Sequence, residues 1–461
     1  MCLAATRATT QTSRFHIVEE ADRLTASERY HRATKHTPHS IAVHPRPDLA
    51  TRPRKFRDNG AAERLPVDRS VAGRLLQAGA GIVRSQSGRD YGGGTMHWRA
   101  YSSAGGLFPV DAYVAGPDGL YSFDVLSHTL ARIGRGDART PVAEALSVQA
   151  DVAAFIVVTG ITARTGWKYG ERGYRHVWWD AGTMLANLLA LAAAEGLAPR
   201  LYTAFVDQEL NALLGVDGTA EMALAVLALG SSPSARESLQ PLSSENVSMA
   251  QRGMRFLLAE AAHAAGILPH AAAVDVWRRP VAGEEPRLDR DRLARAIWRR
   301  TSVRDYAATP LPHAELAELL AWSEAAIPAD APPVVRQVVS VAAVEGLPPG
   351  IYTAALEAER LLAEPRLRAG IGFAAMEQGH VRDGAVNVIQ LARLDAVLDA
   401  LGDRGYRWAH LEAGIRAGRL QVGAFERGWG AAASTFYDDD LAAFLGTTEA
   451  PVLMVAIGCR T

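Results

Sequence analysis

The chain has 461 residues, more than a single hydrophobic core usually organises, and this length predicts two domains. Its 49 Lys and Arg residues nearly balance 50 Asp and Glu residues, so no strongly basic field is present, and we expect neither nucleic acid nor a membrane as a partner. Cys2 and Cys459 are too few for a disulfide framework, and the N-terminus lacks the apolar run of a secretion signal. These features favour a cytoplasmic protein.

The first predicted unit is an N-terminal extension, residues 1–64, which has no counterpart later in the chain. His31, His36 and His39 have a spacing that could suit a metal, but no Cys or clustered carboxylate joins them, so a structural role is favoured. The glycine-rich loop at residues 88–94 lacks the Lys-Ser or Lys-Thr pair of a phosphate-binding loop, and we expect a flexible lid there.

The next elements follow from runs of apolar residues. Residues 154–159 and 334–344 are rich in β-branched residues and are predicted as buried strands. Residues 178–195 are predicted as a helix, apolar nearly all round, that is closed by Gly196 and buried against another domain. The remaining predictions are a linker (231–246), a connector helix (247–266), a proline-rich loop (268–289), an amphipathic helix (311–322) and a helix N-capped by the acidic run 438–440.

An internal repeat relates the two halves of the chain. The stretch RGYRHVWWDAG, Arg172–Gly182, recurs as RGYRWAHLEAG, Arg404–Gly414, with six identical positions and an offset of 404 − 172 = 232. Three shorter matches keep nearly the same offset: 118–121 with 349–352, 205–210 with 436–441, and 224–230 with 452–458. The order and spacing predict a tandem duplication of an α+β unit, whose two copies pack as an internal pseudo-dimer.

Several stretches resemble the nitroreductase superfamily and, within it, the SagB/ThcOx-type flavin dehydrogenases. Tyr101–Val110 is similar to their Ser-Ala-Gly stretch, Lys168–Arg175 to their Lys-Tyr motif, and Arg300–Tyr306 to the Arg-x-Ser-x-Arg motif that opens a nitroreductase domain. Tyr30–His36 is similar to the leader of that subfamily. The resemblance implies two tandem α+β domains, 65–235 and 289–461, each with a mostly antiparallel sheet flanked by helices, joined by a linker and connector helix at 236–288.

The candidate flavin site is divided between the two copies. Arg300, Ser302 and Arg304 offer two guanidinium groups and a hydroxyl within five residues, which suits the phosphate of flavin mononucleotide (FMN). Small residues in the first copy, among them Ser102, Ser103 and Gly105, could let backbone amides approach the flavin ring. Family members take these two sets from two subunits, so we expect one complete FMN site per chain, at the junction of the copies.

Other site residues are implied by the resemblance. It implies that Gly430 and Ala431 present a backbone amide to flavin N5, that Arg460 adds to the phosphate side, and that Asn187 bonds the flavin ring. Lys168 and Tyr169 are implied as the catalytic pair. We expect the lysine cation to favour the phenolate, and burial to lower the pKa of the lysine. No metal site is expected.

The resemblance implies FMN-dependent oxidation of peptide thiazoline or oxazoline rings to thiazoles or oxazoles, in the biosynthesis of a ribosomally made modified peptide. The implied partners are an azoline-containing precursor peptide and a cyclodehydratase complex. Two alternatives stay open: an NAD(P)H-dependent flavin reductase of nitro compounds, quinones or activated alkenes, and a non-catalytic scaffold of a peptide-modifying complex. A monomer that acts as a pseudo-dimer and a homodimer also both stay open.

Overall fold

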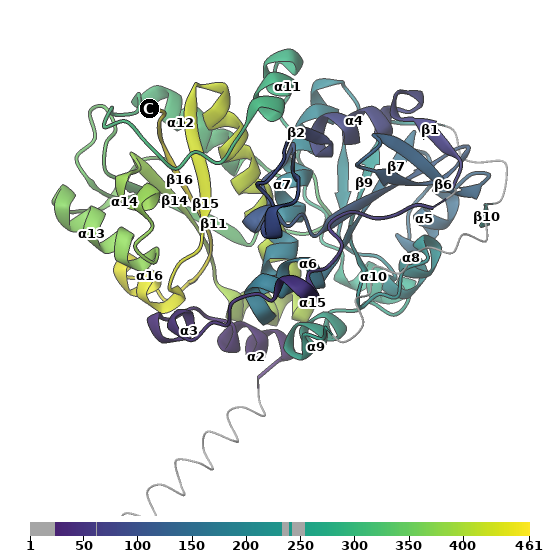
Figure 1. The fold of residues 1–461 in the computed structure, drawn as a ribbon, viewed down its shortest axis with the longest axis horizontal. Helices are drawn as coiled ribbons and strands as arrows, with labels where there is room; N and C mark the ends of the chain where they lie inside the picture. Colours follow the sequence, from purple (N-terminus) through teal and green to yellow (C-terminus); the bar gives the residue numbers. More distant parts are fainter. Residues whose placement is uncertain (1–23, 61, 233–238, 242–253) are drawn as a thin grey trace, which may run out of the picture.

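The structure is a computed structural model and describes residues 24–60, 62–232, 239–241 and 254–461. It contains two antiparallel sheets, one in each half of the chain, with helices around and between them (Figure 1). Most of the linker, the first part of the predicted connector helix and the first 23 residues, which include Cys2, lie outside the described residues.

The first sheet has the strand order β1-β6-β5-β4-β7-β9-β8, with β10 paired to β6. The strands are β1 (Arg64–Pro66), β4 (Val110–Gly116), β5 (Gly119–Asp124), β6 (Thr129–Arg135), β7 (Ala154–Gly160), β8 (Arg200–Tyr202), β9 (Met222–Leu229) and β10 (Gln240–Pro241). A separate hairpin pairs β2 (Ile82–Gln86) with β3 (Met96–Arg99). Strand β7 confirms the predicted strand at 154–159, and every residue in it is buried.

The second sheet repeats this order, β13-β12-β11-β14-β16-β15. Its strands are β11 (Val335–Val341), β12 (Gly350–Thr353), β13 (Ala358–Leu361), β14 (Val386–Ala392), β15 (Trp429–Ser434) and β16 (Ala450–Cys459). Strands β6, β5, β4, β7, β9 and β8 correspond in order to these six, and all neighbouring pairs are antiparallel. The predicted fold, two α+β units with antiparallel sheets, is confirmed.

The repeated sequence RGYR lies at the start of one helix and just after a kink at Gly402 in another, and the two helices pack between the sheets. Helix α7 (Gly173–Ala194) packs against α15 (Leu394–Glu426), and both are buried along most of their length. A Cβ on Gly182 would lie 2.5 Å from the carbonyl oxygen of Leu411, and one on Gly414 would lie 2.6 Å from that of Trp179. The helices therefore cross at the glycine that ends each repeat.

Helix α7 confirms the buried helix predicted at 178–195, although it begins five residues earlier. It continues from α6 (Thr162–Tyr169), and the stretch Thr162–Ala194 is apolar and long enough to cross a membrane by composition alone. In this structure 94% of its most apolar window is buried inside the protein, as expected for the core helix of a globular fold.

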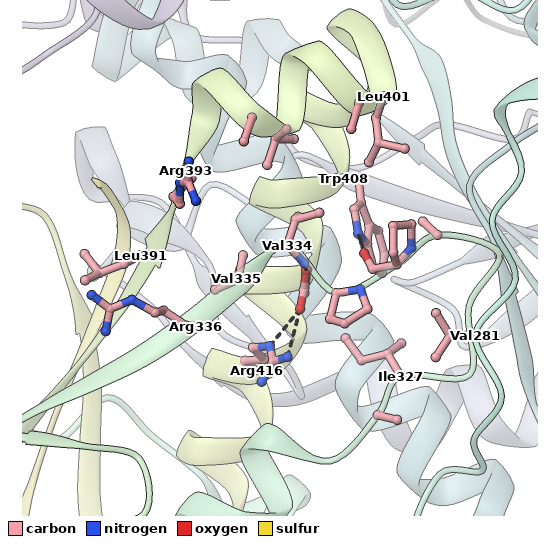
Figure 2. A pocket seen from close by; sticks show the side chains of 18 of the residues that line it. Val281, Ile327, Val334, Val335, Arg336, Leu391, Arg393, Leu401, Trp408 and Arg416 are labelled. Carbon is pink, nitrogen blue, oxygen red and sulfur yellow. Dashed lines mark hydrogen bonds and ion pairs between the residues drawn. The ribbon is translucent and has the colours of Figure 1, made fainter. Parts of the chain in front are cut away.

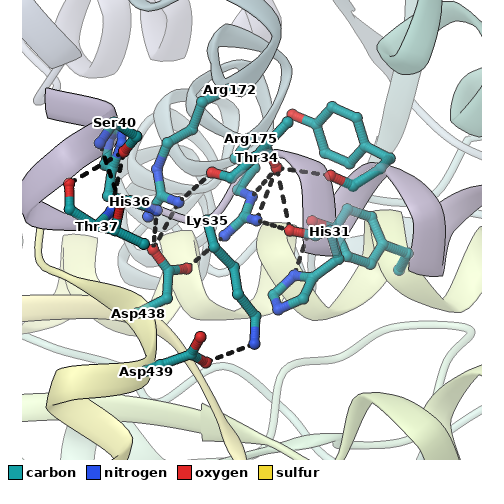
Figure 3. A network of polar contacts seen from close by, with 12 residues as sticks. His31, Thr34, Lys35, His36, Thr37, Ser40, Arg172, Arg175, Asp438 and Asp439 are labelled. Carbon is teal, nitrogen blue, oxygen red and sulfur yellow. Dashed lines mark hydrogen bonds and ion pairs between the residues drawn. The ribbon is translucent and has the colours of Figure 1, made fainter. Parts of the chain in front are cut away.

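The paired arginines of the repeat make reciprocal ion pairs between the domains. Arg172 and Arg175 contact the carboxylate of Asp438 at 2.8 and 2.9 Å (Figure 3). In the other copy, Arg404 and Arg407 contact the carboxylate of Asp207 at 2.7 and 3.2 Å. Thus each copy supplies an arginine pair to the other. The repeat at 172–182 contacts 436–441, and its counterpart at 404–414 contacts 205–210.

The acidic run at 438–440 was predicted as a helix N-cap, and this is wrong in detail. Helix α16 (Asp438–Leu445) starts with Asp438 inside its first turn, and its N-cap residue Tyr437 makes no side-chain cap. The carboxylate of Asp438 turns instead to the two arginines and to the backbone N–H of His36. The negative charge still lies at the positive end of the helix dipole.

The described part of the N-terminal extension, from residue 24 onward, contacts both domains. It contains α2 (Ala26–Ala33) and α3 (Pro38–Ala42). The N–H of Ser27 donates to Asp403 at 2.7 Å, and the ammonium of Lys35 contacts Asp439 at 2.5 Å. Among the described residues no cluster of His, Cys, Asp and Glu could hold a metal ion, and the bonds of His36 and His44 are to the protein itself.

The segment at 268–289 was predicted as loop, but α10 (Ala271–Trp277) forms within it. His270 caps the helix through the N–H of Ala273, and the buried indole of Trp277 donates to the carbonyl of Leu401 at 2.8 Å. This tertiary contact outweighs the proline-rich composition. The other helices are α4 (Val71–Ala80), α5 (Arg139–Ala145), α8 (Asp207–Leu214), α9 (Leu257–Ala265), α11 (Arg290–Arg299), α12 (His313–Glu324), α13 (Glu364–Ala374) and α14 (Gly379–Asp383).

Candidate active site

Two adjoining cavities of about 430 and 640 Å³ lie at the junction of the domains. They share a set of lining residues from both copies: Ser102, Ser103, Gly105, Lys168, Tyr169, Ser302 and Arg304. Arg300 lines the larger cavity. The structure therefore brings together the predicted phosphate clamp of the second domain, the small-residue loop of the first domain and the Lys-Tyr pair.

Arg300 presents a guanidinium group that has no partner in the described part of the chain. Its side chain is buried, with the residue 8% exposed, and its Nη1 makes no hydrogen bond. Burial lowers the pKa of Arg300 to about 10, and no nearby anion offsets that cost. Ser302 and Arg304 are exposed on the same segment, and no ion pair of Arg304 is found among the described residues. This donor set fits a phosphate dianion, which would satisfy the buried guanidinium.

The small-residue loop is held by α7. The carboxylate of Asp180 accepts from the Ser103 hydroxyl at 2.5 Å and from the Ala104 N–H at 3.1 Å. The hydroxyl of Thr183 donates to the carbonyl of Ser102 at 2.7 Å. Gly105 has φ +60°, a backbone conformation that side-chain-bearing residues rarely adopt, and this turn exposes the loop to both cavities.

Asp180 lines the smaller cavity, and sequence reasoning missed it as a site residue. Burial raises the pKa of Asp180 to about 7, although the hydrogen bonds from Ser103 and Ala104 act in the opposite direction. A buried carboxyl that titrates near neutral pH in a cavity is typical of functional sites. A signal was present in the repeat, where Asp180 aligns with another acid, Glu412.

Lys168 and Tyr169 form a cluster with a third residue, Tyr91. The Lys168 ammonium donates to the Tyr91 hydroxyl at 2.8 Å, and this hydroxyl lies 3.3 Å from the carbonyl oxygen of Gly105, to which it donates. A Cβ on Gly105 would lie 2.8 Å from the Tyr169 hydroxyl and 3.3 Å from the Lys168 nitrogen. The glycine therefore leaves the space in which these three polar groups meet.

Tyr91 belongs to the loop predicted as a flexible lid, and in the structure two residues of this loop contact the extension. Arg52 bonds the carbonyl of Tyr91 at 3.0 Å and pairs with Asp90 at 2.8 Å. The ring of Tyr91 also packs edge-on against Trp167. The extension thus holds the loop at Asp90 and Tyr91. The sequence does not reveal the contact of Arg52 with Tyr91, so it could not predict that this tyrosine is a site residue.

The expected pKa changes of the Lys-Tyr pair are also wrong. Burial alone would lower the pKa of Lys168, but Tyr169 and Tyr91 outweigh it, and the pKa of Lys168 is raised. Burial raises the pKa of Tyr169 more than the neighbouring ammonium lowers it. At neutral pH the pair therefore consists of a phenol and an ammonium, both proton donors, and not of a phenolate.

The outer wall of the smaller cavity comes from the extension, which the sequence did not connect with the site. Its lining residues are His36, Ile41, His44, Pro45, Arg46 and Pro47. The imidazole of His44 donates to the carbonyl of Lys168 at 2.8 Å. Other lining residues that were missed are His176, whose ring stacks on Tyr169 at 4.3 Å, and Ser434 and Thr435 at the end of β15. The Thr435 hydroxyl is buried without a partner among the described residues.

Four predicted residues lie away from the lining of these cavities, as far as the described residues show. The Asn187 amide donates to the carbonyls of Gly79 and Ala100 within the first domain. Gly430 and Ala431 lie in β15, where Ala431 accepts from the Val303 N–H and so supports the clamp segment from behind. Arg460 bonds the carbonyl of Gly428 at 2.8 Å.

Comparison with known proteins agrees with this architecture. The Nitroreductase family model matches residues 54–231 and 297–459, one match in each domain. Over 185 residues, which are 38% of this chain and 93% of the relative, the chain is 25% identical to the putative nitroreductase MJ1384 of Methanocaldococcus jannaschii. The crystal structure of a putative nitroreductase from Anabaena variabilis covers 95% of this chain and 100% of its own, with 23% identity and a TM-score of 0.81, and so shares the fold across both domains. Nitroreductase family members are flavin oxidoreductases and generally bind FMN. Because the family model matches well over half of the sequence, the chain belongs to the nitroreductase family, with two nitroreductase domains in tandem.

Proposed function

We propose that the protein is an FMN-dependent dehydrogenase that oxidises thiazoline or oxazoline rings of a precursor peptide to thiazoles or oxazoles. The observation that carries the proposal is the meeting of the Arg300 clamp with the Lys168, Tyr169 and Tyr91 cluster in adjoining cavities. The first group fits a flavin phosphate, and the second supplies proton-transfer groups beside the small-residue loop. The Lys-Tyr motif is the feature by which the chain resembles azoline oxidases.

Arg300, Ser302 and Arg304 would hold the FMN phosphate, and the backbone at Ser103 to Gly105 would face the ring. When bound, FMN would supply the acceptor for a hydride. Oxidation of an azoline removes a hydride from one ring carbon and a proton from the other. The protonated state of Lys168 and Tyr169 suits them to donate hydrogen bonds to the ring nitrogen, which makes the neighbouring C–H more acidic.

The proton also needs a route from the reacting ring to solvent. Tyr169, Lys168 and Tyr91 place three exchangeable protons in contact, and the Tyr91 side chain is half-buried at the outer end of the cluster. Asp180, with a pKa of about 7, lines the same cavity and can exist as a carboxylate at neutral pH. The chain's own groups therefore provide both donors and an acceptor for the proton.

A reaction with a synthetic azoline peptide tests this function. The FMN-loaded protein should bleach anaerobically when the azoline peptide is added, and mass spectrometry should show a product that is lighter by two hydrogens. The same peptide with its ring already aromatic is the control and should leave the flavin oxidised. Rapid bleaching by NADPH, together with no reaction of the azoline, would contradict the proposal and favour a nicotinamide-dependent reductase. A purified protein without flavin would favour the scaffold.

A further inference from the structure

The duplication creates a second junction between the domains, equivalent to the candidate active site. A cavity of about 600 Å³ lies on the second-domain side of this junction, lined by residues of the second domain and by Val281 of the linker (Figure 2). With the offset of 232 in the helix repeat, Trp408 and Glu412 take the positions of His176 and Asp180. The Val334 N–H donates to Glu412 at 2.8 Å, as the Ala104 N–H donates to Asp180 at 3.1 Å. The cavity is therefore the counterpart of the active site in the other copy.

This second cavity has lost the groups that suit a flavin. Ala400 and Leu401 stand where the first copy has Lys168 and Tyr169, and the stretch Pro332–Val335 replaces the small polar loop at Ser102–Gly105. Prolines offer no N–H to a ligand. The equivalents of Ser434 and Thr435 are Thr203 and Ala204, whose N–H groups are already bonded to the carboxylate of Asp330 at 2.8 and 3.0 Å. The cavity is similar in volume to the larger active-site cavity, but its lining residues differ in chemical character.

The walls of the cavity are mostly apolar, and Figure 2 shows Trp408, Val334 and Ile327 around the same space. At its floor Arg416 pairs with Glu412 at 2.9 Å and with Glu324 at 3.0 Å, which leaves that guanidinium fully engaged. At its rim the ion pair of Arg336 with Glu449 is likewise complete. These two arginines and three glutamates therefore already have ion-pair partners within the protein.

Arg393 is the exception. It lines the cavity just before α15, its side chain is exposed, and the described residues provide it with no hydrogen-bond or ion-pair partner. Three cationic and three anionic side chains line the cavity, and after the pairs at the floor and rim are made, Arg393 is the cation left over. An anion at the rim would give the Arg393 guanidinium a partner, while the apolar walls would take an apolar body.

We propose that this cavity is a second ligand site, separate from the flavin site, for a small molecule with a flat apolar body and one anionic group. The body packs between the Trp408 indole, Ile327 and Val334, where it removes apolar surface from water. The anionic group contacts the guanidinium of Arg393 at the rim. Because this cavity has neither the Lys-Tyr pair nor the small polar loop, it is a binding site without redox chemistry.

Two dyes that share an aromatic body test the proposal on the FMN-loaded protein. The anionic dye is 1-anilinonaphthalene-8-sulfonate, and the neutral dye is N-phenyl-1-naphthylamine, which lacks the sulfonate. Equilibrium dialysis should show one saturable site per chain for the anionic dye. Ala400→Trp, at an exposed position of the wall, should weaken both dyes at least tenfold. Ala396→Trp narrows the same space from the neighbouring turn and serves as the second variant if the first fails to fold. Retention of bound FMN reports whether each variant is folded.

Arg393→Gln separates the anion contact from the apolar one. It should weaken the sulfonate dye about three- to tenfold, the range of an exposed charge-assisted contact, and leave the neutral dye unchanged. Arg366→Gln, at an exposed arginine on α13 away from the cavity, is the matched control and should change neither dye. No saturable binding, or binding that both tryptophan variants leave intact, would overturn the site. Equal behaviour of the two dyes in Arg393→Gln would overturn the anionic class of ligand.

Discussion

Arg300 lowers the stability of the folded protein when no anion is bound, because its buried guanidinium has no partner among the described residues. Arg300→Met keeps the apolar stem and removes the charge. We expect the apoprotein to become more stable in urea unfolding, by about 1–3 kcal/mol, while FMN affinity falls at least tenfold. Arg304→Met, at an exposed position, should weaken FMN without the gain in stability. Full retention of FMN by both variants would contradict the phosphate assignment.

The Tyr91, Lys168 and Tyr169 cluster leads to a prediction about rate. Tyr169→Phe and Lys168→Ala should keep FMN bound and lower azoline turnover about 10²–10⁴-fold, because positioned acid–base groups contribute that much. Tyr91→Phe removes only the hydroxyl that accepts from Lys168, so we expect a smaller loss, about tenfold, and a changed pH dependence of turnover. Flavin reduction by dithionite is the control and should be normal in all three. Loss of flavin or of stability instead would indicate a structural role.

Asp180 should make the stability of the protein depend on pH. Its pKa is about 7 in the folded protein, whereas an unperturbed aspartate titrates near pH 3.9. The unfolded chain therefore loses this proton at lower pH than the folded chain does, so the contribution is greatest below about pH 4 and is lost as the pH rises through about 7. Relative to Asp180→Asn, which does not titrate, the wild type should lose up to ~4 kcal/mol over this range. A constant difference between the two urea-unfolding free energies would contradict the assignment.

The sequence predicted the clamp and the Lys-Tyr pair because each is a short local motif. Tyr91, Asp180 and His44 were missed as site residues for a common physical reason: each reaches the site through contacts distant in sequence, such as Ser103 with Asp180. The directions of the pKa changes were missed because they depend on the balance between burial and neighbouring charge, which no spacing in the sequence reveals.

At the scale of elements, helices α7 and α16 are joined by the ion pairs of Arg172 and Arg175 with Asp438 (Figure 3). Asp438→Ala would leave two buried guanidinium groups without their carboxylate, so we expect a loss of about 3–5 kcal/mol in the free energy of unfolding. Asp439→Ala is the matched control, since its ion pair with Lys35 is exposed and should contribute less than about 1 kcal/mol.

The same variant should also loosen the extension, because Asp438 accepts from the N–H of His36. Limited proteolysis should therefore cleave near Lys35 faster in Asp438→Ala. Asp207→Ala breaks the equivalent contact of the other copy, which does not bond the extension, and should destabilise the protein without this effect. Equal cleavage in both variants would mean that global unfolding, and not release of the extension, exposes the site.

On the scale of the whole molecule, the duplication could be predicted from the sequence, but the role of the repeated residues could not. The repeat at an offset near 231 predicted two similar units, and the strand orders of the two sheets agree with it. The repeat itself did not show what its arginine pairs and glycines do, and the structure shows that they form the contact between the domains. The residues that differ between the copies form the candidate active site, and the residues that the copies share form the contact between the domains.

This asymmetry predicts one FMN per chain. At the second junction the carboxylate of Asp330 already holds the N–H groups of Thr203 and Ala204, and its buried position is fixed by the segment that also bonds Leu201. No counterpart of Arg300 faces that cavity among the described residues. Flavin absorbance after denaturation, measured against protein concentration, should therefore give a ratio of one. Asp330→Ala should leave the ratio at one, because removing the carboxylate restores neither the clamp nor the small polar loop. A ratio of two in either protein would mean that the second junction binds flavin through other groups, and both the divided site and the separate ligand cavity would have to be abandoned.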